Sequence, residues 1–164
     1  MTSPTSSAAA PLTAEEEACY RALMRATARI SRAFDADLMR THGMSLTDYG
    51  TLAFLSEAPR RQMRMSDLAA LSDFSLSGMT RVVDRLAAQR LVRRERSADD
   101  GRSWNAVLTD EGLRRLRDAW PAHLASARRH VIDHFGGLDL RALTAAFDRF
   151  ASGDQPPMPP PTEP

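Results

Sequence analysis

The stretch from Met65 to Thr109 constrains the fold more than any other part of this chain, because helical and strand patterns follow one another there at short intervals. It predicts two helices and then two strands, over Ser66–Ser72, Leu76–Gln89, Leu91–Arg96 and Trp104–Leu108. A charged turn at Ala98–Arg102 joins the two strands, and Gly101 gives that turn its conformational freedom. Such an order limits the chain to a small set of helix-and-hairpin folds.

The second predicted helix has one clearly apolar face. Its apolar residues follow the spacing i, i+3, i+4, i+7, and they are Met79, Val82, Val83 and Leu86. This is the spacing of one buried face of an α-helix. Ser75 precedes the helix and is a good N-cap, because its hydroxyl can accept a hydrogen bond from a free amide of the first turn.

The leading end of the same helix is narrow, polar and basic. Ser77 and Gly78 are small, and Arg81 follows one turn later. Small residues allow close approach in a DNA major groove, and an arginine there can make a bidentate contact with guanine. The alternative is an ordinary amphipathic surface helix whose arginines are solvated.

The predicted hairpin is also basic. Strand alternation places Arg94 and Arg96 on the same face. An arginine on a thin hairpin suits the minor groove, whose negative potential attracts it. Asp100 could hold Arg102 in position by a charge-assisted hydrogen bond, although a solvated hairpin turn is the plainer alternative. Helix, helix and basic hairpin together predict a winged helix-turn-helix, mainly α with a small β-hairpin wing.

At these residues the sequence resembles the MarR family of transcriptional regulators. The matching segments are Met65–Ala69, Ser77–Leu86, Leu91–Arg94, Asp100–Arg102 and Val107–Gly112, within a resemblance that covers about Glu15–Ala151. One departure is Gly101, where the family usually has a basic residue. The resemblance implies a homodimer that binds a near-palindromic operator, usually represses, and is often released by a small phenolic or acidic ligand.

We therefore assign nine residues to a double-stranded DNA interface: Ser75, Ser77, Gly78, Thr80, Arg81, Arg85, Arg94, Asp100 and Arg102. Ser77, Gly78 and Arg81 are expected to contact base edges, and Thr80 and Arg85 to contact phosphates. Charge agrees with this assignment. The chain has a net charge of +1, yet residues 60–102 contain ten arginines and six acids, which gives that segment +4. All 22 basic residues are arginine, a bias that fits a GC-rich coding sequence better than selection at one site.

The segments on either side of the winged region predict a dimerisation bundle. Residues 14–41 form a long helix capped by Thr13, residues 110–134 a second one capped by Thr109, and residues 140–150 a third, each with an apolar stripe. The stripe of the third helix is expected to be buried, and its residues are Leu140, Leu143, Ala146, Phe147 and Phe150. A further helix, capped by Thr47, should end near Glu57. The domain then spans residues 14–151, with the winged part at about 45–109 and dimerisation helices at about 14–41 and 110–151. Residues 1–13 and 152–164 are expected to be disordered tails.

The resemblance also suggests where a ligand would bind, at the junction of the dimerisation helices and the winged part. Tyr49, Trp120 and an arginine of the first helix, Arg25 or Arg29, are candidates to line such a pocket. They could equally be core or surface residues.

The signals for metal binding, redox sensing and catalysis are weaker in this sequence. His130 and His134 have the i, i+4 spacing of two zinc ligands, and Cys19 could be a redox sensor, but a surface pair and a small apolar residue are the plainer interpretations. Two alternatives belong to other functional classes of protein. One is an enzyme that uses these histidines and Asp133, and the other is a dimeric protein-interaction module without DNA binding. We expect no catalytic residues, cofactor, metal, signal peptide or membrane span, and therefore a cytoplasmic protein.

Overall fold

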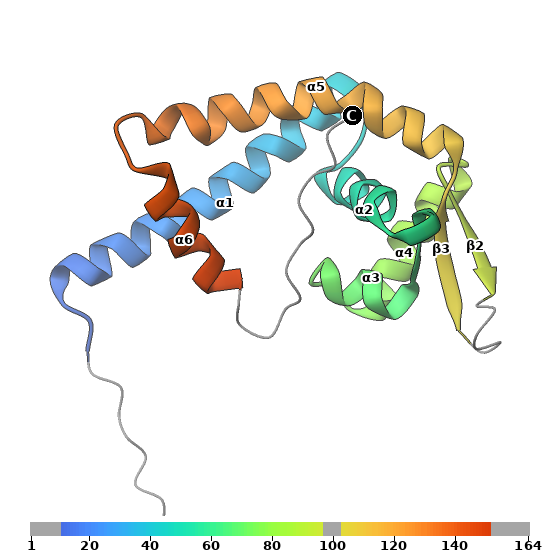
Figure 1. Cartoon of the computed structure of the whole chain (residues 1–164), viewed down its shortest axis with the longest axis horizontal. Coiled ribbons are helices and arrows are strands. Elements are labelled where there is room, and N and C mark those ends of the chain that lie inside the picture. The colour runs from blue at the N-terminus through green and yellow to red at the C-terminus, as the bar shows by residue number, and fades with distance from the viewer. Residues whose placement is uncertain (1–10, 97–102, 152–164) are drawn as a thin grey trace, which may run out of the picture.

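The computed structural model describes residues 11–96 and 103–151, and within these ranges the chain is mainly helical with one small sheet. The elements in order are α1 (Ala14–His42), α2 (Leu46–Glu57), the 3₁₀ turn η1 (Pro59–Arg61), β1 (Gln62–Arg64), α3 (Met65–Leu71), α4 (Leu76–Ala88), β2 (Val92–Arg96), β3 (Trp104–Leu108), α5 (Asp110–His130), the 3₁₀ turn η2 (Ile132–Phe135) and α6 (Leu140–Ala151). Figure 1 shows two parts: α2 to β3 gather at one end, and α1 and α5 extend away from them as an arm. The predicted fold class is confirmed.

The winged part is built around the apolar face of α4. Met79, Val82, Val83 and Leu86 are all buried, as the spacing predicts. They pack in one core with residues of α2, α3 and the sheet. The sheet has three antiparallel strands in the order β1-β3-β2, with Val92 opposite Leu108 and Arg96 opposite Trp104. The two predicted strands are therefore present, and the short β1 adds a third on the other edge of β3.

Side-chain caps set most helix starts. Thr13 caps α1 in a reciprocal capping box with Glu16, and Thr109 caps α5 by accepting from the Gly112 amide. One predicted cap is wrong. The N-cap of α2 is Ser45, which accepts from the Asp48 amide, and Thr47 lies inside the helix. Ser45 takes the role because it has the extended backbone that the cap position requires.

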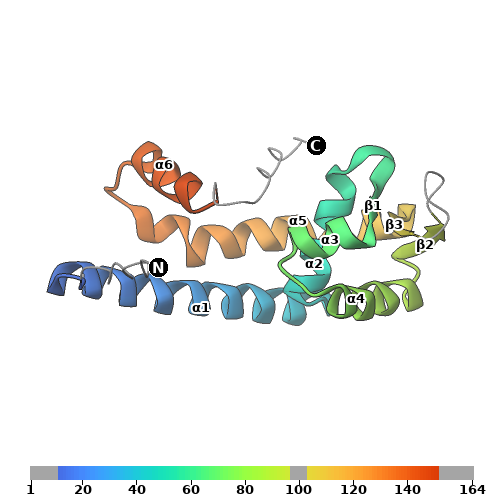
Figure 2. The same ribbon diagram turned by 90° about the horizontal axis from the view of Figure 1, so that it is seen from below.

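The arm consists of α1 and α5, which lie side by side in both views (Figures 1 and 2). The second long helix is shorter than predicted. It ends at His130, where Val131 leaves the helical backbone region, and η2 follows it. Pro121 lies inside α5, and the helix continues through it.

The predicted burial of α6 is wrong for the single chain. Leu140 is 51% exposed and Phe150 is 70% exposed. Phe147 contacts Phe135 of η2 by its ring but is also exposed. The apolar stripe of α6 thus exists as the periodicity predicts, but it faces outward. No helix among the described residues is long and apolar enough to cross a membrane.

Candidate nucleic-acid interface and effector site

The leading end of α4 carries most of the predicted DNA contacts, and it is exposed. Ser75 accepts from the Gly78 amide at 3.1 Å, so its hydroxyl acts as the predicted cap, and it also lies 3.2 Å from the Ser77 hydroxyl. Arg81 is exposed one turn later and forms no ion pair with any other residue that the structure describes. Its guanidinium is therefore available to an external partner.

Two small residues of α4 have structural roles of their own. A Cβ at Gly78 would lie 3.2 Å from Ser75 Oγ and 3.3 Å from Phe74 Cδ1, so the glycine also allows the turn to pack tightly. Thr80 is half-buried, and its hydroxyl donates to the Leu76 carbonyl at 2.8 Å. Their predicted contacts with DNA are not tested by these observations.

Arg85 is held by a buried carboxylate. Its Nη2 and Nε atoms donate to Oδ1 of Asp48 at 2.7 and 3.2 Å, and Asp48 is buried at the first turn of α2. The pair therefore fixes α4 against α2. The predicted phosphate contact of Arg85 remains a prediction, but its guanidinium would have to serve both partners. Sequence reasoning missed Asp48, because a pair 37 residues apart leaves no periodic signal.

Arg94 and Arg96 lie on one face of β2, as predicted, and both stack on Trp104. The guanidinium carbon of each lies 5.3 Å from the centre of the Trp104 ring. Arg94 also pairs with Asp84 of α4 at 3.0 Å, which ties the wing to that helix. Trp104 was not predicted as part of this site, although a tryptophan on a polar hairpin was a usable signal. Asp100 and Arg102, the other predicted wing contacts, lie outside the described residues.

A cluster of rings fills the junction between the arm and the winged part. His123 of α5 stacks on Tyr49 of α2 at 4.4 Å between ring centres and meets Phe34 of α1 edge-on at 5.3 Å. Trp120 lies 6.1 Å from His123 and is more exposed. The structure thus brings together two predicted pocket residues, Tyr49 and Trp120, through a histidine that sequence reasoning assigned to no pocket.

Two polar atoms in this cluster have no hydrogen-bond partner among the described residues, Tyr49 Oη and His123 Nδ1. Burial raises the pKa of Tyr49 and lowers the pKa of His123, so both side chains are neutral near neutral pH. Unpaired buried polar atoms cost free energy, and a ligand that bonds to them would recover it. Arg25 and Arg29 are not part of this cluster; Arg29 lines a different cavity further along α1.

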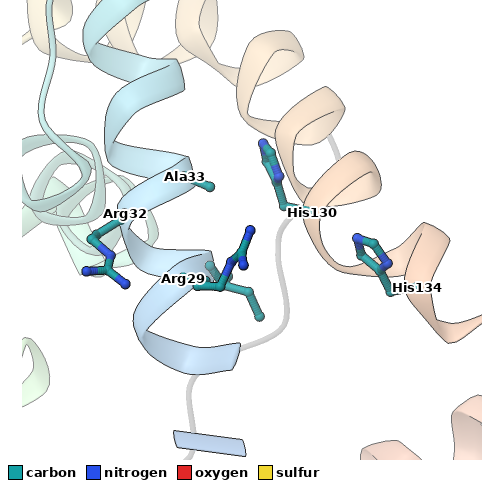
Figure 3. A pocket seen from close by; sticks show the side chains of 6 residues that line it. Arg29, Arg32, Ala33, His130 and His134 are labelled. Atoms are coloured by element: carbon teal, nitrogen blue, oxygen red, sulfur yellow. The ribbon is translucent and has the colours of Figure 1, made fainter. Parts of the chain in front are cut away.

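Cys19 and the two histidines considered for sensing do not form one cluster, although His130 and His134 line the same cavity (Figure 3). Cys19 is exposed near the start of α1. His130 contacts Asp37 at 3.0 Å, while His134 lies on η2, beyond the end of α5. Within the described ranges, no group of three histidine, cysteine, aspartate or glutamate residues could hold a metal ion.

An exposed basic helix held beside an arginine-bearing hairpin defines the class: a winged helix-turn-helix DNA-binding regulator. The sequence model of the MarR family matches residues 42–103. The MarR family regulator Sco3205 of Streptomyces coelicolor, solved in complex with DNA, is 35% identical, with 90% of this chain and 93% of that chain covered and a TM-score of 0.82. AbsC, from the same organism, is 36% identical, with 87% and 96% covered and a TM-score of 0.79.

A more distant structure, CouR of Rhodococcus jostii bound to p-coumaroyl-CoA, shares the fold at 23% identity, with 86% and 94% covered and a TM-score of 0.72. A comparison with curated proteins finds no match. With 35% identity to Sco3205 over 90% of its length, the chain belongs to the MarR family of transcriptional regulators. The predicted family is confirmed, and regulators of this family bind DNA and are not enzymes.

Proposed function

We propose that this regulator binds a near-palindromic operator as a homodimer, represses transcription in the cytoplasm, and is released by a small phenolic or acidic ligand. In this proposal α4 enters the major groove of each half-site. Ser77, Gly78 and Arg81 contact base edges, and Thr80 and Arg85 contact phosphates. Ser75 caps the helix at the groove, Arg94 supports the wing, and Arg102 enters the minor groove with Asp100 orienting it.

The observation that carries the DNA-binding mode is the exposed Arg81, which has no ion pair with any other described residue and lies one turn behind a narrow helix start. A planar guanidinium that is not held by an ion pair can direct two of its N–H donors to the O6 and N7 acceptors of a guanine. The related Sco3205 was solved in complex with DNA, which supports the same use of this fold here.

The outward-facing apolar residues of the arm support the homodimer. Large apolar side chains on the two arm helices and on α6 are exposed in one chain: Tyr20, Met24, Leu124, Leu140, Phe147 and Phe150. An apolar surface of this extent is typical of a protein interface. A second copy related by a two-fold axis would cover the same residues on both chains and would set two α4 helices apart for two half-sites.

Tyr49 Oη and His123 Nδ1, which have no hydrogen-bond partner among the described residues, support the proposed binding of an effector ligand. A phenolic hydroxyl or carboxylate could bond to both while its ring joins the aromatic cluster. Because this cluster joins α1, α2 and α5, a ligand there would change how the arm holds the winged part. CouR was solved with p-coumaroyl-CoA, which contains a phenol.

The test is selection of bound sequences from random DNA by the purified protein. We expect an inverted repeat whose half-sites lie about 10 base pairs apart. Arg81→Ala should cost about 1–3 kcal/mol on the selected operator and relax the preference at one position in each half-site. An equal loss on all sequences would make Arg81 a phosphate contact. Selection of no sequence, with binding that does not change with salt, would favour an interaction module without DNA binding.

A further inference from the structure

A tryptophan and two arginines share one face of the wing. In the register of β2 and β3, Arg96 lies opposite Trp104. Arg94 lies opposite Ala106, two residues along each strand and therefore on the same face. Ala106 is fully buried, and Arg94 pairs with Asp84 of α4 at 3.0 Å. This face of the wing therefore turns toward the helix that carries the proposed base contacts.

Trp104 connects the two arginines. The guanidinium carbon of Arg94 and that of Arg96 each lie 5.3 Å from the centre of its ring, which is within the range of a cation–π attraction. The Trp104 side chain is 39% exposed and is not part of the hydrophobic core that the described residues form. The ring thus contributes to the wing through its arginines and not through the core.

A series of contacts leads from α4 to Arg96. Asp84 of α4 accepts a hydrogen bond from Arg94 Nη1. Arg94 and Arg96 stack on the same Trp104 ring. Stacking uses the flat face of a guanidinium and leaves the N–H donors at its edge for other partners. Arg96 is therefore exposed on the wing and is also restrained relative to α4.

An arginine restrained in this way suits a phosphate of the DNA backbone. Once a helix lies in a major groove, the neighbouring phosphates stand at fixed places relative to that helix, and phosphate contacts fix the orientation of a protein on the duplex. A side chain that is already ordered loses less conformational freedom when it binds. The ring can therefore raise affinity for DNA without contacting a base.

We propose that Trp104 is a positioning residue for DNA binding, and that Arg96, which it holds, contacts a backbone phosphate beside the groove that α4 enters. Arg94 is the fixed member of the stack, because Asp84 already holds it. This role rests on the proposed binding of DNA by α4 and the wing, and it adds a contact that contributes affinity without reading sequence.

The experiment measures the affinity of the full chain for its selected operator by fluorescence anisotropy at several salt concentrations. Arg96→Gln should weaken binding by about tenfold and lower the slope of log K against log salt concentration by about one for each bound wing. Arg93→Gln is the matched control, because Arg93 carries the same charge on the opposite face of β2 and pairs with Glu95. The control should change affinity by less than about threefold, because salt screens an exposed charge that makes no direct contact.

Two replacements of Trp104 separate its aromatic ring from its bulk. Trp104→Phe keeps an aromatic face and should bind within about threefold of the parent, whereas Trp104→Leu keeps apolar bulk without that face and should lose nearly as much affinity as Arg96→Gln. The double variant Trp104→Leu, Arg96→Gln should bind no more weakly than Arg96→Gln alone, because the ring acts through that arginine. Every variant should select the same DNA sequence.

Three results would overturn this role while leaving DNA binding by α4 intact. They are losses that multiply in the double variant, equal binding by the Phe and Leu variants, and a selected sequence that changes with Trp104. A parent that selects no sequence would instead contradict the proposed function, and this role with it. Circular dichroism of each variant must match that of the parent, and Trp104→Met replaces Trp104→Leu if the latter is misfolded.

Discussion

Gly112 shows how one residue can set the join between the wing and α5. It lies in the first turn of α5, where the Thr109 hydroxyl also bonds to the Arg90 and Leu91 carbonyls. A Cβ at this position would overlap the Leu91 carbonyl oxygen and lie 2.7 Å from Leu108 Cδ1. Backbone cannot move aside as a flexible side chain does, so only glycine fits here without displacing a strand.

We predict that Gly112→Ala lowers the free energy of unfolding by about 1–3 kcal/mol, the range for overpacking a tight site. Chemical denaturation monitored by circular dichroism measures it. Gly50→Ala is the matched control, because Gly50 lies inside α2 with open space around its Cα. That change should stabilise the protein by about 0.5–1 kcal/mol, and an equal destabilisation by both variants would contradict the steric explanation.

The sequence predicted the contacts that repeat along one element and missed those that join distant ones. The buried face of α4 and the caps Ser75 and Thr109 follow from local spacing, and the structure confirms them. The Asp48–Arg85 pair and the stacking of Trp104 under Arg94 depend on which elements meet in space. Periodicity also shows that a helix has an apolar stripe without showing what covers it, so the burial predicted for the α6 stripe does not follow from its own chain, in which Leu140 and Phe150 are exposed.

At the scale of elements, the orientation of α4 depends on its attachment to α2. Asp48 of α2 is buried and accepts two hydrogen bonds from Arg85 of α4. Asp84 of α4 is exposed and accepts one hydrogen bond from Arg94 of β2. Hydrogen bonds to charged groups contribute more to stability when they are shielded from water. The two pairs should therefore differ in their effect on stability.

We predict that Asp48→Asn lowers the free energy of unfolding by roughly 1.5–3 kcal/mol, while Asp84→Asn lowers it by less than about 1 kcal/mol. Thermal and urea unfolding of both variants measure the difference. Asp48→Asn should also weaken operator binding, because a loosened α4 no longer presents Arg81 at a fixed angle. Equal stability of the two variants would show that the buried pair does not anchor the helix.

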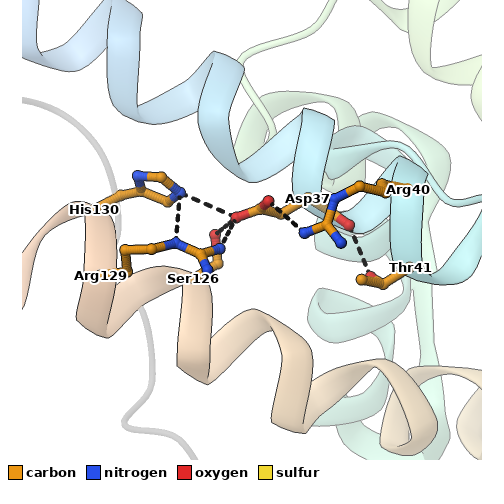
Figure 4. A network of polar contacts seen from close by, with 6 residues as sticks. All are labelled: Asp37, Arg40, Thr41, Ser126, Arg129 and His130. Atoms are coloured by element: carbon orange, nitrogen blue, oxygen red, sulfur yellow. Dashed lines mark hydrogen bonds and ion pairs between the residues drawn. The ribbon is translucent and has the colours of Figure 1, made fainter.

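Within the arm, Asp37 joins α1 to α5. Its Oδ2 accepts from Ser126 at 2.8 Å and Arg129 at 2.5 Å and lies 3.0 Å from His130 Nε2, and its Oδ1 accepts from Arg40 at 2.9 Å (Figure 4). These contacts, the Ser126 hydroxyl first among them, hold the pKa of Asp37 well below its usual range. The charged carboxylate is thus the form that the folded arm prefers.

The sign of the pH dependence follows from that preference. The folded pKa is below the unfolded value of about 3.9, so the stabilisation is fully present above that pH and is lost as the pH falls below it. Asp37→Asn should lower stability near pH 7 and flatten the loss of stability between about pH 5 and pH 2. Urea unfolding across this range measures both effects. Asp133→Asn, an exposed residue on η2, should leave the curve as it is in the parent.

At the scale of the whole molecule, most of the exposed large apolar side chains belong to α1, α5 and α6 and the segments that join them, although Phe74, Leu76 and Trp104 of the winged part are also exposed. The largest exposed fraction belongs to Phe150 of α6, and Phe147 is next to it on the same stripe. Ala145 lies on the opposite side of the helix by the 100° turn per residue. A carboxylate on the stripe would have to be buried in a dimer, whereas one at Ala145 would stay in water.

We predict that the double variant Phe147→Asp, Phe150→Asp sediments as a single chain at concentrations where the parent sediments as a pair, and that Ala145→Asp leaves the parent's behaviour unchanged. Two buried carboxylates without partners cost several kcal/mol, enough to dissociate a dimer of ordinary affinity. The double variant should also bind the selected operator far more weakly, because each winged part then binds its half-site without the other. If the double variant still sediments as a dimer, α6 does not lie in the interface. If the parent is a monomer, the proposed binding of both half-sites by a two-fold symmetric dimer is wrong.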